Sequence, residues 1–284
     1  MLSNLIYDIG MNDGNDTAYY LRRGFRVIAV EANPKLVANA AERFANEIKS
    51  GQLTILNIGI GAEEGEFPFW ICETHPKFSS FDRTMASRDG SPHHEIRVPC
   101  RRFETVLKEF GVPHYLKIDI EGNEILCIQD LDPKTLPKFI SVEATDLNLS
   151  LLTLLRDRGF KQFKCISQYN FLPLELPFTI EHRRYERAQW LADTKNPFVR
   201  VFRGLGGRDW IDRKLNRRRN YNGWSFPSGS SGPFGDELPG HWLSYDELKT
   251  IYEHYFSLFQ AKKQTIFWPN VPYSFWTDFH ARCD

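Results

Sequence analysis

Short apolar runs alternate with helix-like segments along the first 170 residues of this 284-residue chain, and this order limits the possible fold more than any other feature. Six runs have the length of core strands: 5–9, 25–32, 53–61, 114–120, 138–144 and 159–167. A further strand, 64–73, is expected at a sheet edge. Because strands joined through helices lie parallel in one sheet, we predict an α/β fold with a mostly parallel sheet wrapped by helices. The ligand crevice of such a sheet lies outside the carboxyl ends of its strands.

One of the expected helices is marked at both ends. Asn33 can cap its first turn, Pro34 suits that turn, and Gly51 follows its end. Its apolar stripe consists of Leu36, Val37, Ala40, Ala41, Phe44 and Ile48. A shorter helix is expected from about Asp16, and it ends before Gly24.

The last third of the chain differs in character from the rest. It holds six of the seven tryptophans and a Ser/Gly/Pro-rich stretch, 225–240, which is expected to be loop. Ser244 and Glu247 form a capping box that opens a helix, and its apolar face consists of Leu248, Ile251, Tyr252, Tyr255 and Phe259. We therefore predict a sheet domain over residues 1–180 and an aromatic-rich elaboration over residues 181–284, packed on the core and on the substrate side.

Charge and composition indicate which kinds of partner and which cellular compartment to expect. Lys plus Arg (36) equals Asp plus Glu (36), so no nucleic-acid partner is expected, although the local basic run 212–220 is either a solvated surface or an RNA or phosphate site. No apolar stretch approaches the roughly 18 residues of a membrane span, and the N-terminus lacks the pattern of a signal peptide. The five cysteines have no C-x-x-C spacing, which is typical of reduced, buried thiols. We expect a cytoplasmic protein.

The stretch YDIGMNDGNDT, residues 7–17, has the pattern of a ligand-binding turn. Asp8 ends the first strand, and Gly10, Asn12 and Gly14 lead into a helix, so the backbone can approach a ligand closely. A dinucleotide site has the spacing G-x-G-x-x-G, whereas this turn has G-x-N-x-G. Asp8 and Asp13 would repel a pyrophosphate and suit a ligand that carries an ammonium and a sulfonium. The turn therefore favours S-adenosylmethionine over a dinucleotide.

A carboxylate at the end of the second strand supports this interpretation. Glu31 lies 21 residues after Gly10, where an acidic side chain can accept hydrogen bonds from both ribose hydroxyls of an adenosine. Enzymes that use NAD place an acid here too, so Glu31 indicates adenosine binding without choosing the cofactor. The structural alternative for Glu31 is an ordinary charge at a strand end.

Several of these segments together resemble a known family. DIGMNDG, VEANP, LNIGIGAEEGE, SSF at 79–81, LKIDIEGNE at 116–124 and SVEATD at 141–146 occur in the order seen in FkbM-type methyltransferases. The resemblance covers residues from about 5 to 170, and its most specific element is the D-x-E-G of residues 119–122. It implies a Rossmann-like class I methyltransferase fold that binds S-adenosylmethionine. Members of the family are mostly O-methyltransferases of natural-product or glycan hydroxyls.

The resemblance and the strand ends together give a candidate site. The predicted cofactor-binding residues are Asp8, Gly10, Asn12, Gly14, Glu31, Gly59, Ile60, Ser80 and Asp119. Gly59 and Ile60 are expected at the end of the third strand, against the adenine. Ser79 and Ser80 match the family's paired serines, with either a bond to the cofactor or a turn-forming role.

Carboxylates are the predicted catalytic groups, because a hydroxyl acceptor has to lose a proton as it is methylated. Asp119 and Glu121 follow the fourth strand, and Glu143 and Asp146 leave the fifth strand beside them. Such a cluster can raise the pKa of its members, bind a divalent cation, or simply hydrogen-bond the loop and cap the next helix. We predict no metal site. His75 and His241 are alternative bases, although surface or packing roles are commoner for single histidines.

The predicted function is therefore S-adenosylmethionine-dependent methylation of a hydroxyl on a small-molecule, glycan or natural-product acceptor. Two alternatives stay open. In the first, the acceptor is an amine or peptide nitrogen, which needs less help from a base than a hydroxyl does. In the second, the domain binds ligands or partners without catalysing a reaction. The intact glycine turn and Glu31 argue against the second alternative. The sequence leaves the acceptor, the base and the oligomeric state open.

Overall fold

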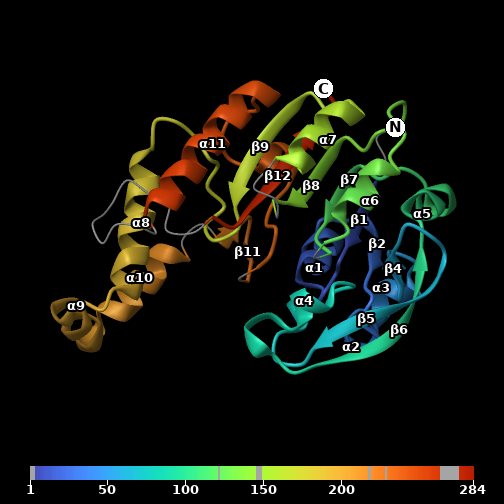
Figure 1. Ribbon diagram of the computed structural model, residues 1–284, viewed down its shortest axis with the longest axis horizontal. Coiled ribbons are helices and arrows are strands. Elements are labelled where there is room, and N and C mark those ends of the chain that lie inside the picture. Colours follow the sequence, from blue (N-terminus) through green and yellow to red (C-terminus); the bar gives the residue numbers. More distant parts are fainter. Residues whose placement is uncertain (1–3, 121, 145–148, 217–218, 228, 263–274) are drawn as a thin grey trace. The chain divides into compact units, whose positions relative to one another are not determined.

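The computed structural model describes residues 4–120, 122–144, 149–216, 219–227, 229–262 and 275–284 (Figure 1). The chain forms two compact units, the first from Met1–Gln162 with His280–Asp284 and the second from Phe163–Phe279. The contacts thus divide the chain at residue 162, whereas the sequence changes character at about residue 180. The predicted role of the later residues at the substrate side stays a prediction.

The main sheet has seven strands in the order β3-β2-β1-β7-β8-β12-β9. Its strands are β1 Leu5–Ile9, β2 Arg26–Val30, β3 Leu53–Leu56, β7 Tyr115–Ile118, β8 Phe139–Glu143, β9 Gln162–Ser167 and β12 Thr277–Arg282. Parallel pairing links β3 to β2, β2 to β1, β1 to β7 and β7 to β8. The predicted mostly parallel sheet is confirmed. Every residue of β1 and β7 is buried, as expected for strands of a parallel sheet covered on both faces.

The last strand of the chain was not predicted from the sequence. Backbone hydrogen bonds join Lys161 to Arg282 (2.9 Å) and Gln168 to Trp276 (3.0 Å), so β12 runs antiparallel to β9. Its sequence, TDFHAR, contains few aliphatic residues, yet its first five residues are buried. The strand was therefore missed because its charged and polar residues do not form an apolar run.

The helices of the first unit are α1 Asn15–Arg22, α2 Pro34–Arg43, α3 Ala45–Lys49, α4 Arg83–Ala86, α5 Phe103–Phe110, α6 Glu124–Gln129 and α7 Ser150–Arg158, with 3-10 turns η1 Pro76–Phe78 and η2 Arg88–Gly90. The predicted cap of α2 is confirmed, because the Asn33 side chain accepts a hydrogen bond from the Lys35 N–H. The helix predicted as one piece is broken at Phe44, whose φ of −110° and ψ of 27° are not helical. The buried Phe44 ring lies directly against Gly14, so the residue at which the helix breaks is also the residue that packs on the glycine turn.

A second sheet of three strands has the order β4-β6-β5, with β4 Gly59–Ile60, β5 Gly65–Cys72 and β6 His93–Arg101. The strand predicted over residues 53–61 is therefore wrong, because β3 and β4 belong to different sheets. The Asn57 amide between them donates to the Glu31 and Ala32 carbonyls at 3.0 and 3.2 Å, and Gly59 then pairs with Cys100. β5 lies at the edge of this sheet, as predicted.

The second unit contains α8 Ile180–Asp193, α9 Pro197–Phe202, the π-helical turn η3 Arg203–Gly207, α10 Arg208–Leu215, β10 Asn220–Tyr221, β11 Trp224–Ser225, the 3-10 turn η5 Gly235–Glu237 and α11 Tyr245–Lys262. The predicted capping box is confirmed. The Ser244 N–H donates to the Glu247 carboxylate at 2.8 Å, and the Glu247 N–H donates to the Ser244 hydroxyl at 3.3 Å. No helix in the described part of the chain combines the length and the apolar character of a membrane span.

Candidate functional site

The carboxyl ends of three adjacent strands of the first unit meet at one place. The N–H groups of Gly10 and Met11 both donate to the Val30 carbonyl, at 2.9 and 3.0 Å, and tie the turn after β1 to the end of β2. On the other side, the Asp119 N–H donates to the Ile9 carbonyl at 2.9 Å and ties the end of β7 to β1. The predicted residues of the turn, of β2 and of β7 therefore lie together.

The spacing of Gly10, Asn12 and Gly14 follows from backbone conformation. Their φ values are +84°, +53° and +76°, so every second residue of the turn is left-handed. Glycine adopts this conformation freely, and asparagine tolerates it better than most other residues. A Cβ atom at residue 10 would also lie 1.7 Å from the Asp119 carbonyl oxygen. Only glycine therefore allows the turn after β1 and the segment after β7 to approach this closely.

The N–H groups of this turn are largely used inside the protein. Those of Gly10 and Met11 bind the Val30 carbonyl, and the Asn12 N–H donates to the Glu31 carboxylate at 2.8 Å. The Gly14 N–H donates to the Met11 carbonyl at 3.0 Å. The Asn15 N–H donates to the Asp13 carboxylate at 3.2 Å. A pyrophosphate is held by free N–H groups at the start of a helix. These N–H groups are already engaged, so the turn has few donors for a phosphate.

Glu31 connects the turn to the helix that follows β2. One of its carboxylate oxygens accepts from the Asn12 N–H and the other from the Asn33 N–H, each at 2.8 Å. Burial raises the pKa of this carboxyl, and the two N–H groups oppose that effect by stabilising the charged form. A carboxylate has about four lone-pair positions, so Glu31 retains acceptor capacity for further donors.

Lys117, in the middle of β7, binds the carboxylates beneath the turn. Its ammonium lies 3.0 Å from an Asp8 carboxylate oxygen and 3.1 Å from the Gly10 carbonyl oxygen. Asp119 and Asp16 lie further away, at 3.6 and 3.9 Å. Burial acts to lower the pKa of Lys117, but the surrounding carboxylates, Asp8 above all, raise it well above its ordinary value. The lysine is therefore held in its charged form.

Asp8 and Asp119 flank this lysine but differ in exposure. The Asp8 side chain is 0% exposed, and its second oxygen accepts from the Thr17 hydroxyl at 2.6 Å. The Asp119 side chain is 27% exposed. Of the two carboxylates, Asp119 is therefore the one that a ligand can reach. The buried Asp8 carboxylate is paired with Lys117 inside the protein. The predicted contacts of both residues with a ligand stay predictions.

The role of Lys117 was missed in the sequence, although a signal was present. A lysine within the buried strand YLKI is rarely tolerated unless it is paired. An acidic partner on an adjacent strand was therefore to be expected, and Asp8 occupies the paired position on β1.

The segment after β7 is tied to the first residue of α6 and to β4. Both oxygens of the buried Glu124 carboxylate accept from the Gly122 N–H, at 3.0 and 3.1 Å, and burial raises the pKa of this group. The Asn123 amide donates to the Ile60 carbonyl at 3.1 Å, which brings the predicted Ile60 to this segment. Glu121, the second predicted catalytic residue, lies outside the described residues.

The structure places the remaining candidates as follows. A Cβ atom at residue 59 would lie 2.2 Å from the Phe81 ring, so Gly59 is packed closely against its neighbours. The buried Ser80 hydroxyl accepts from the Asp82 N–H at 3.0 Å, in agreement with the turn-forming alternative. His75 and His241 are exposed, each in a different unit.

Two carboxylates, Glu143 and Asp146, were predicted to leave the end of β8. Glu143 is the last residue of β8, and Asp146 lies outside the described residues. Within the described ranges, no three His, Cys, Asp or Glu side chains are arranged as metal ligands.

Comparison with known families settles the class of protein. Residues 8–161, more than half of the chain, match the methyltransferase FkbM domain. The chain belongs to this family. The resemblance seen in the sequence is thereby confirmed, and the turn at Gly10, Glu31, Lys117 and the segment after β7 all lie within the matched FkbM domain.

Solved structures similar to this FkbM protein have low sequence identity. A methyltransferase FkbM from Methylobacillus flagellatus KT is 18% identical with a TM-score of 0.39, over 57% of this chain and 39% of the other. A precorrin-6y C5,15-methyltransferase from Geobacter metallireducens GS-15 is 16% identical with a TM-score of 0.33, over 57% of this chain and 65% of the other. The chain thus spans less than two thirds of either relative. No curated protein sequence matches the chain.

Proposed function

We propose that this FkbM-family protein uses S-adenosylmethionine to methylate a hydroxyl group on a small-molecule, glycan or natural-product acceptor. One observation carries the choice of cofactor. The turn after β1 has few free N–H groups for a phosphate, whereas carboxylates of Glu31 and Asp119 lie on either side of it. This chemistry suits a ligand with ribose hydroxyls, an ammonium and a sulfonium.

The residues at the three strand ends match the polar groups of this cofactor. Glu31 would accept hydrogen bonds from the ribose hydroxyls with the lone pairs that Asn12 and Asn33 leave free. Asp119, partly exposed and 3.6 Å from the Lys117 ammonium, would face the methionine part. The Ile60 region, tied to Asn123, would lie against the adenine.

The cofactor supplies an activated methyl group on a sulfonium, and the chain would have three tasks. It would hold the acceptor oxygen in line with the methyl group, keep water out, and take the hydroxyl proton. Asp119 and Glu121 are the proposed proton acceptors. The Lys117 ammonium, 3.6 Å from the Asp119 carboxylate, would help to hold Asp119 in position.

The role of Glu31 predicts a specific loss of cofactor affinity. Glu31→Ala should weaken binding of S-adenosylmethionine by about 1–3 kcal/mol, the scale for lost hydrogen bonds to a charged group. Isothermal titration calorimetry measures this change, and Glu73→Ala at an exposed carboxylate is a matched control that should bind as the wild type does. Unchanged affinity in Glu31→Ala would place the ribose elsewhere. No heat from the wild type, far above micromolar concentrations, would favour a non-catalytic binding protein.

The pKa of Glu31 also predicts a pH dependence of cofactor binding. Burial raises this pKa above the ordinary value of about 4.3, so the carboxyl loses its proton at a higher pH than an exposed glutamate. The charged form accepts hydrogen bonds better, so affinity should rise as pH increases through the raised pKa. Glu31→Gln cannot ionise, and its affinity should lack this rise. An identical profile in wild type and Glu31→Gln would assign the effect to another group.

The proposed base predicts a difference between hydroxyl and amine acceptors. Asp119→Asn combined with Glu121→Gln should lower kcat for a hydroxyl acceptor by roughly 10²–10⁴-fold, the contribution of general acid–base catalysis. Transfer of a labelled methyl group to a panel of hydroxyl and amine acceptors measures this loss, with cofactor affinity measured in parallel. A variant that still binds the cofactor and methylates an amine at the wild-type rate would favour the nitrogen acceptor.

A further inference from the structure

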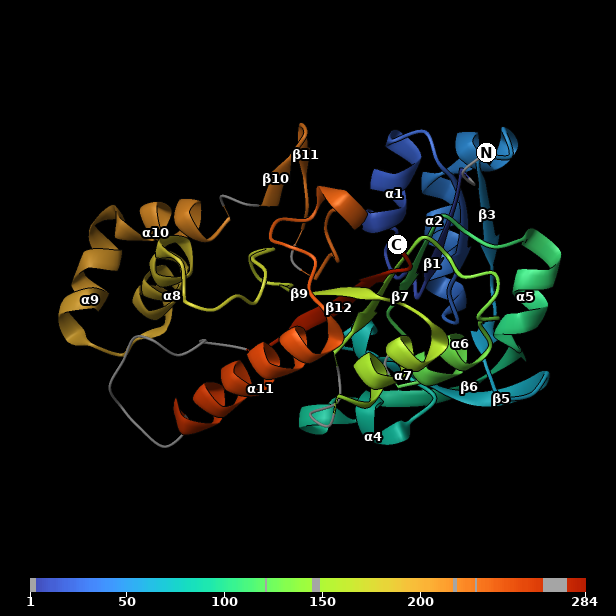
Figure 2. The same ribbon diagram turned by 90° about the horizontal axis from the view of Figure 1, so that it is seen from above.

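The second unit exposes an unusual concentration of apolar side chains. Nine large apolar residues are exposed among the described residues, and five of them lie between residues 198 and 210: Phe198, Val201, Phe202, Leu205 and Trp210. Phe198 is 83% exposed, Leu205 82% and Val201 62%. We call residues 197–207, which form α9 and η3 between α8 and α10, the α9 tip (Figure 2). A soluble monomer rarely exposes grouped apolar side chains without a binding role.

Helical spacing puts three of these side chains on one face of α9. Residues 198, 201 and 202 are separated by three or four positions, so their side chains project from the same side of α9. Arg200 lies between them in sequence and projects elsewhere, and it is exposed. α9 therefore has an apolar face with the cation Arg200 on another side, and this combination also occurs in helices that lie in a membrane interface.

The α9 tip is held in place by its own contacts. The Asn196 side chain accepts from the Phe198 N–H at 2.9 Å and caps α9. The Arg203 guanidinium donates to the Ala192 and Thr194 carbonyls at the end of α8, and the Phe202 ring covers Gly207. Phe198, Val201 and Leu205 thus project from a fixed turn and need no rearrangement to reach a partner.

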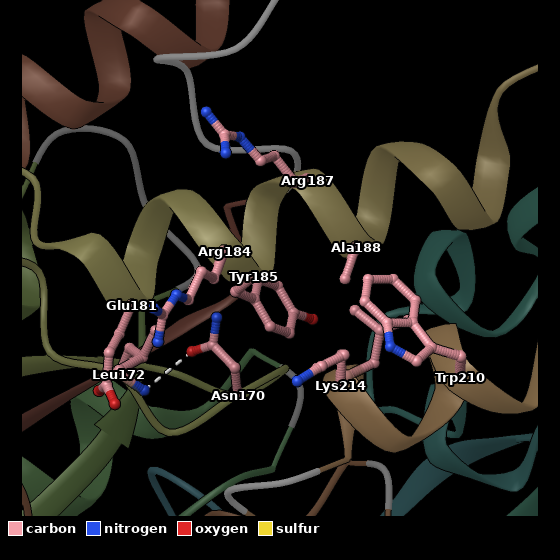
Figure 3. Close-up of a pocket in the computed structure, with 10 residues that line it drawn as sticks. Asn170, Leu172, Glu181, Arg184, Tyr185, Arg187, Ala188, Trp210 and Lys214 are labelled. Carbon is pink, nitrogen blue, oxygen red and sulfur yellow. Dashed lines mark hydrogen bonds between the residues drawn. The ribbon is translucent and has the colours of Figure 1, made fainter.

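The sequence around the α9 tip is strongly basic. Residues 196–220 contain eight arginines or lysines and only two acidic residues. The basic character continues into a cavity of about 450 Å³ lined by α8 and α10, where Arg184, Lys214 and Trp210 are among the lining residues (Figure 3). Trp210 belongs both to this cavity and to the exposed apolar group, so the apolar and cationic features are continuous.

Charge and apolar exposure together select the partner. A second copy of this chain, docked through the same surface, would bring the exposed Arg200 and Arg208 close to the same arginines of the first copy, and like charges repel. A nucleic acid would neutralise the arginines but leave Val201 and Leu205 in water. A bilayer with anionic lipids satisfies both requirements, because its headgroups attract cations and its interface accepts apolar side chains.

We propose that the α9 tip docks the protein on anionic lipid bilayers. Phe198, Val201 and Leu205 insert at the level of the headgroups, and Arg200 and Arg208 contact the lipid phosphates. The proposal does not depend on the methyl-transfer reaction.

Co-sedimentation of the full chain with vesicles tests the proposal. The wild type should bind vesicles of phosphatidylcholine with phosphatidylserine and should not bind vesicles of phosphatidylcholine alone. Phe198→Ser with Leu205→Ser should lower the partition coefficient at least tenfold. Arg200→Gln with Arg208→Gln should lower it about 25-fold, because each basic residue at an anionic surface contributes about fivefold.

The matched control replaces exposed apolar side chains that are not part of the α9 tip. Ile48 lies in the first unit, and Ile180 begins α8, about 20 Å along the helix from its other end. Ile48→Ser with Ile180→Ser should bind vesicles as the wild type does. Circular dichroism and the midpoint of urea unfolding show whether each variant is folded.

Four results would overturn the proposal. The first is equal vesicle binding by the α9-tip variants and the wild type, and the second is equal wild-type binding to both kinds of vesicle. The third is concentration-dependent dimerisation in sedimentation velocity, lost in Phe198→Ser with Leu205→Ser, without vesicle binding. The fourth is saturable binding of an RNA oligonucleotide, lost in the arginine variant, again without vesicle binding.

Discussion

Replacing Lys117 by methionine should destabilise the protein by about 3–5 kcal/mol, the cost of removing one partner of a buried ion pair. The Lys117 ammonium lies 3.0 Å from Asp8, whose side chain is fully buried. Methionine fills a similar volume but leaves the Asp8 charge without its cation, away from water. Because natural domains are stable by roughly 5–15 kcal/mol, this loss is large, and urea unfolding at pH 8 measures it directly. At that pH Lys117 is charged, since its pKa lies well above its ordinary value.

Two further variants separate the buried pair from a general effect of losing a lysine. Lys108 is 72% exposed and lies 3.0 Å from Glu104, so Lys108→Met should cost only about 0.2–1 kcal/mol. Asp8→Asn in the Lys117→Met background removes the unpaired charge and should recover part of the lost stability. If Lys117→Met and Lys108→Met are equally stable, or if Asp8→Asn lowers stability further, then the buried pair does not have the role assigned to it.

The sequence predicted the parts of the fold that depend on local pattern. Short apolar runs between helical segments were sufficient for the parallel strands β1, β2, β7 and β8, and Asn33 and Ser244 capped their helices as expected. Two features escaped prediction because they depend on tertiary contacts. The break between β3 and β4 follows from the Asn57 amide binding the end of β2. The strand β12 is buried beside β9 despite its polar sequence.

In the candidate site, too, the spacing of residues was visible in the sequence, whereas their tertiary hydrogen-bond partners were not. The alternating pattern of Gly10, Asn12 and Gly14 was visible in the sequence, and the structure explains it by three left-handed residues. Glu31 was expected at the end of β2, where it lies, but its bond to the Asn12 N–H joins it to the turn. The pairing of Asp8 with Lys117 joins residues 109 positions apart, so the lysine in a buried strand indicates an acidic partner but not which residue it is.

The glycine turn carries the second large prediction, which concerns ligand binding rather than stability alone. Gly10→Ala places a Cβ atom 1.7 Å from the Asp119 carbonyl oxygen, and neither backbone segment can give way without moving β1 or β7. The turn and Asp119 must therefore separate. Since both are proposed to contact S-adenosylmethionine, cofactor affinity should fall by at least about 100-fold, or about 2.7 kcal/mol.

Gly24 provides a matched control for this substitution. Its φ of +83° is nearly the same as the +84° of Gly10, but a Cβ atom at residue 24 would meet nothing within 4 Å. Gly24→Ala therefore carries the same backbone strain, about 1 kcal/mol or somewhat more, without the collision. It should lower the midpoint of urea unfolding modestly and leave affinity in calorimetry unchanged. Were both alanine variants to bind the cofactor as the wild type does, the close approach of Gly10 to Asp119 would have no part in binding. If only Gly10→Ala loses cofactor affinity while it stays folded, then the glycine turn after β1 takes part in binding the cofactor.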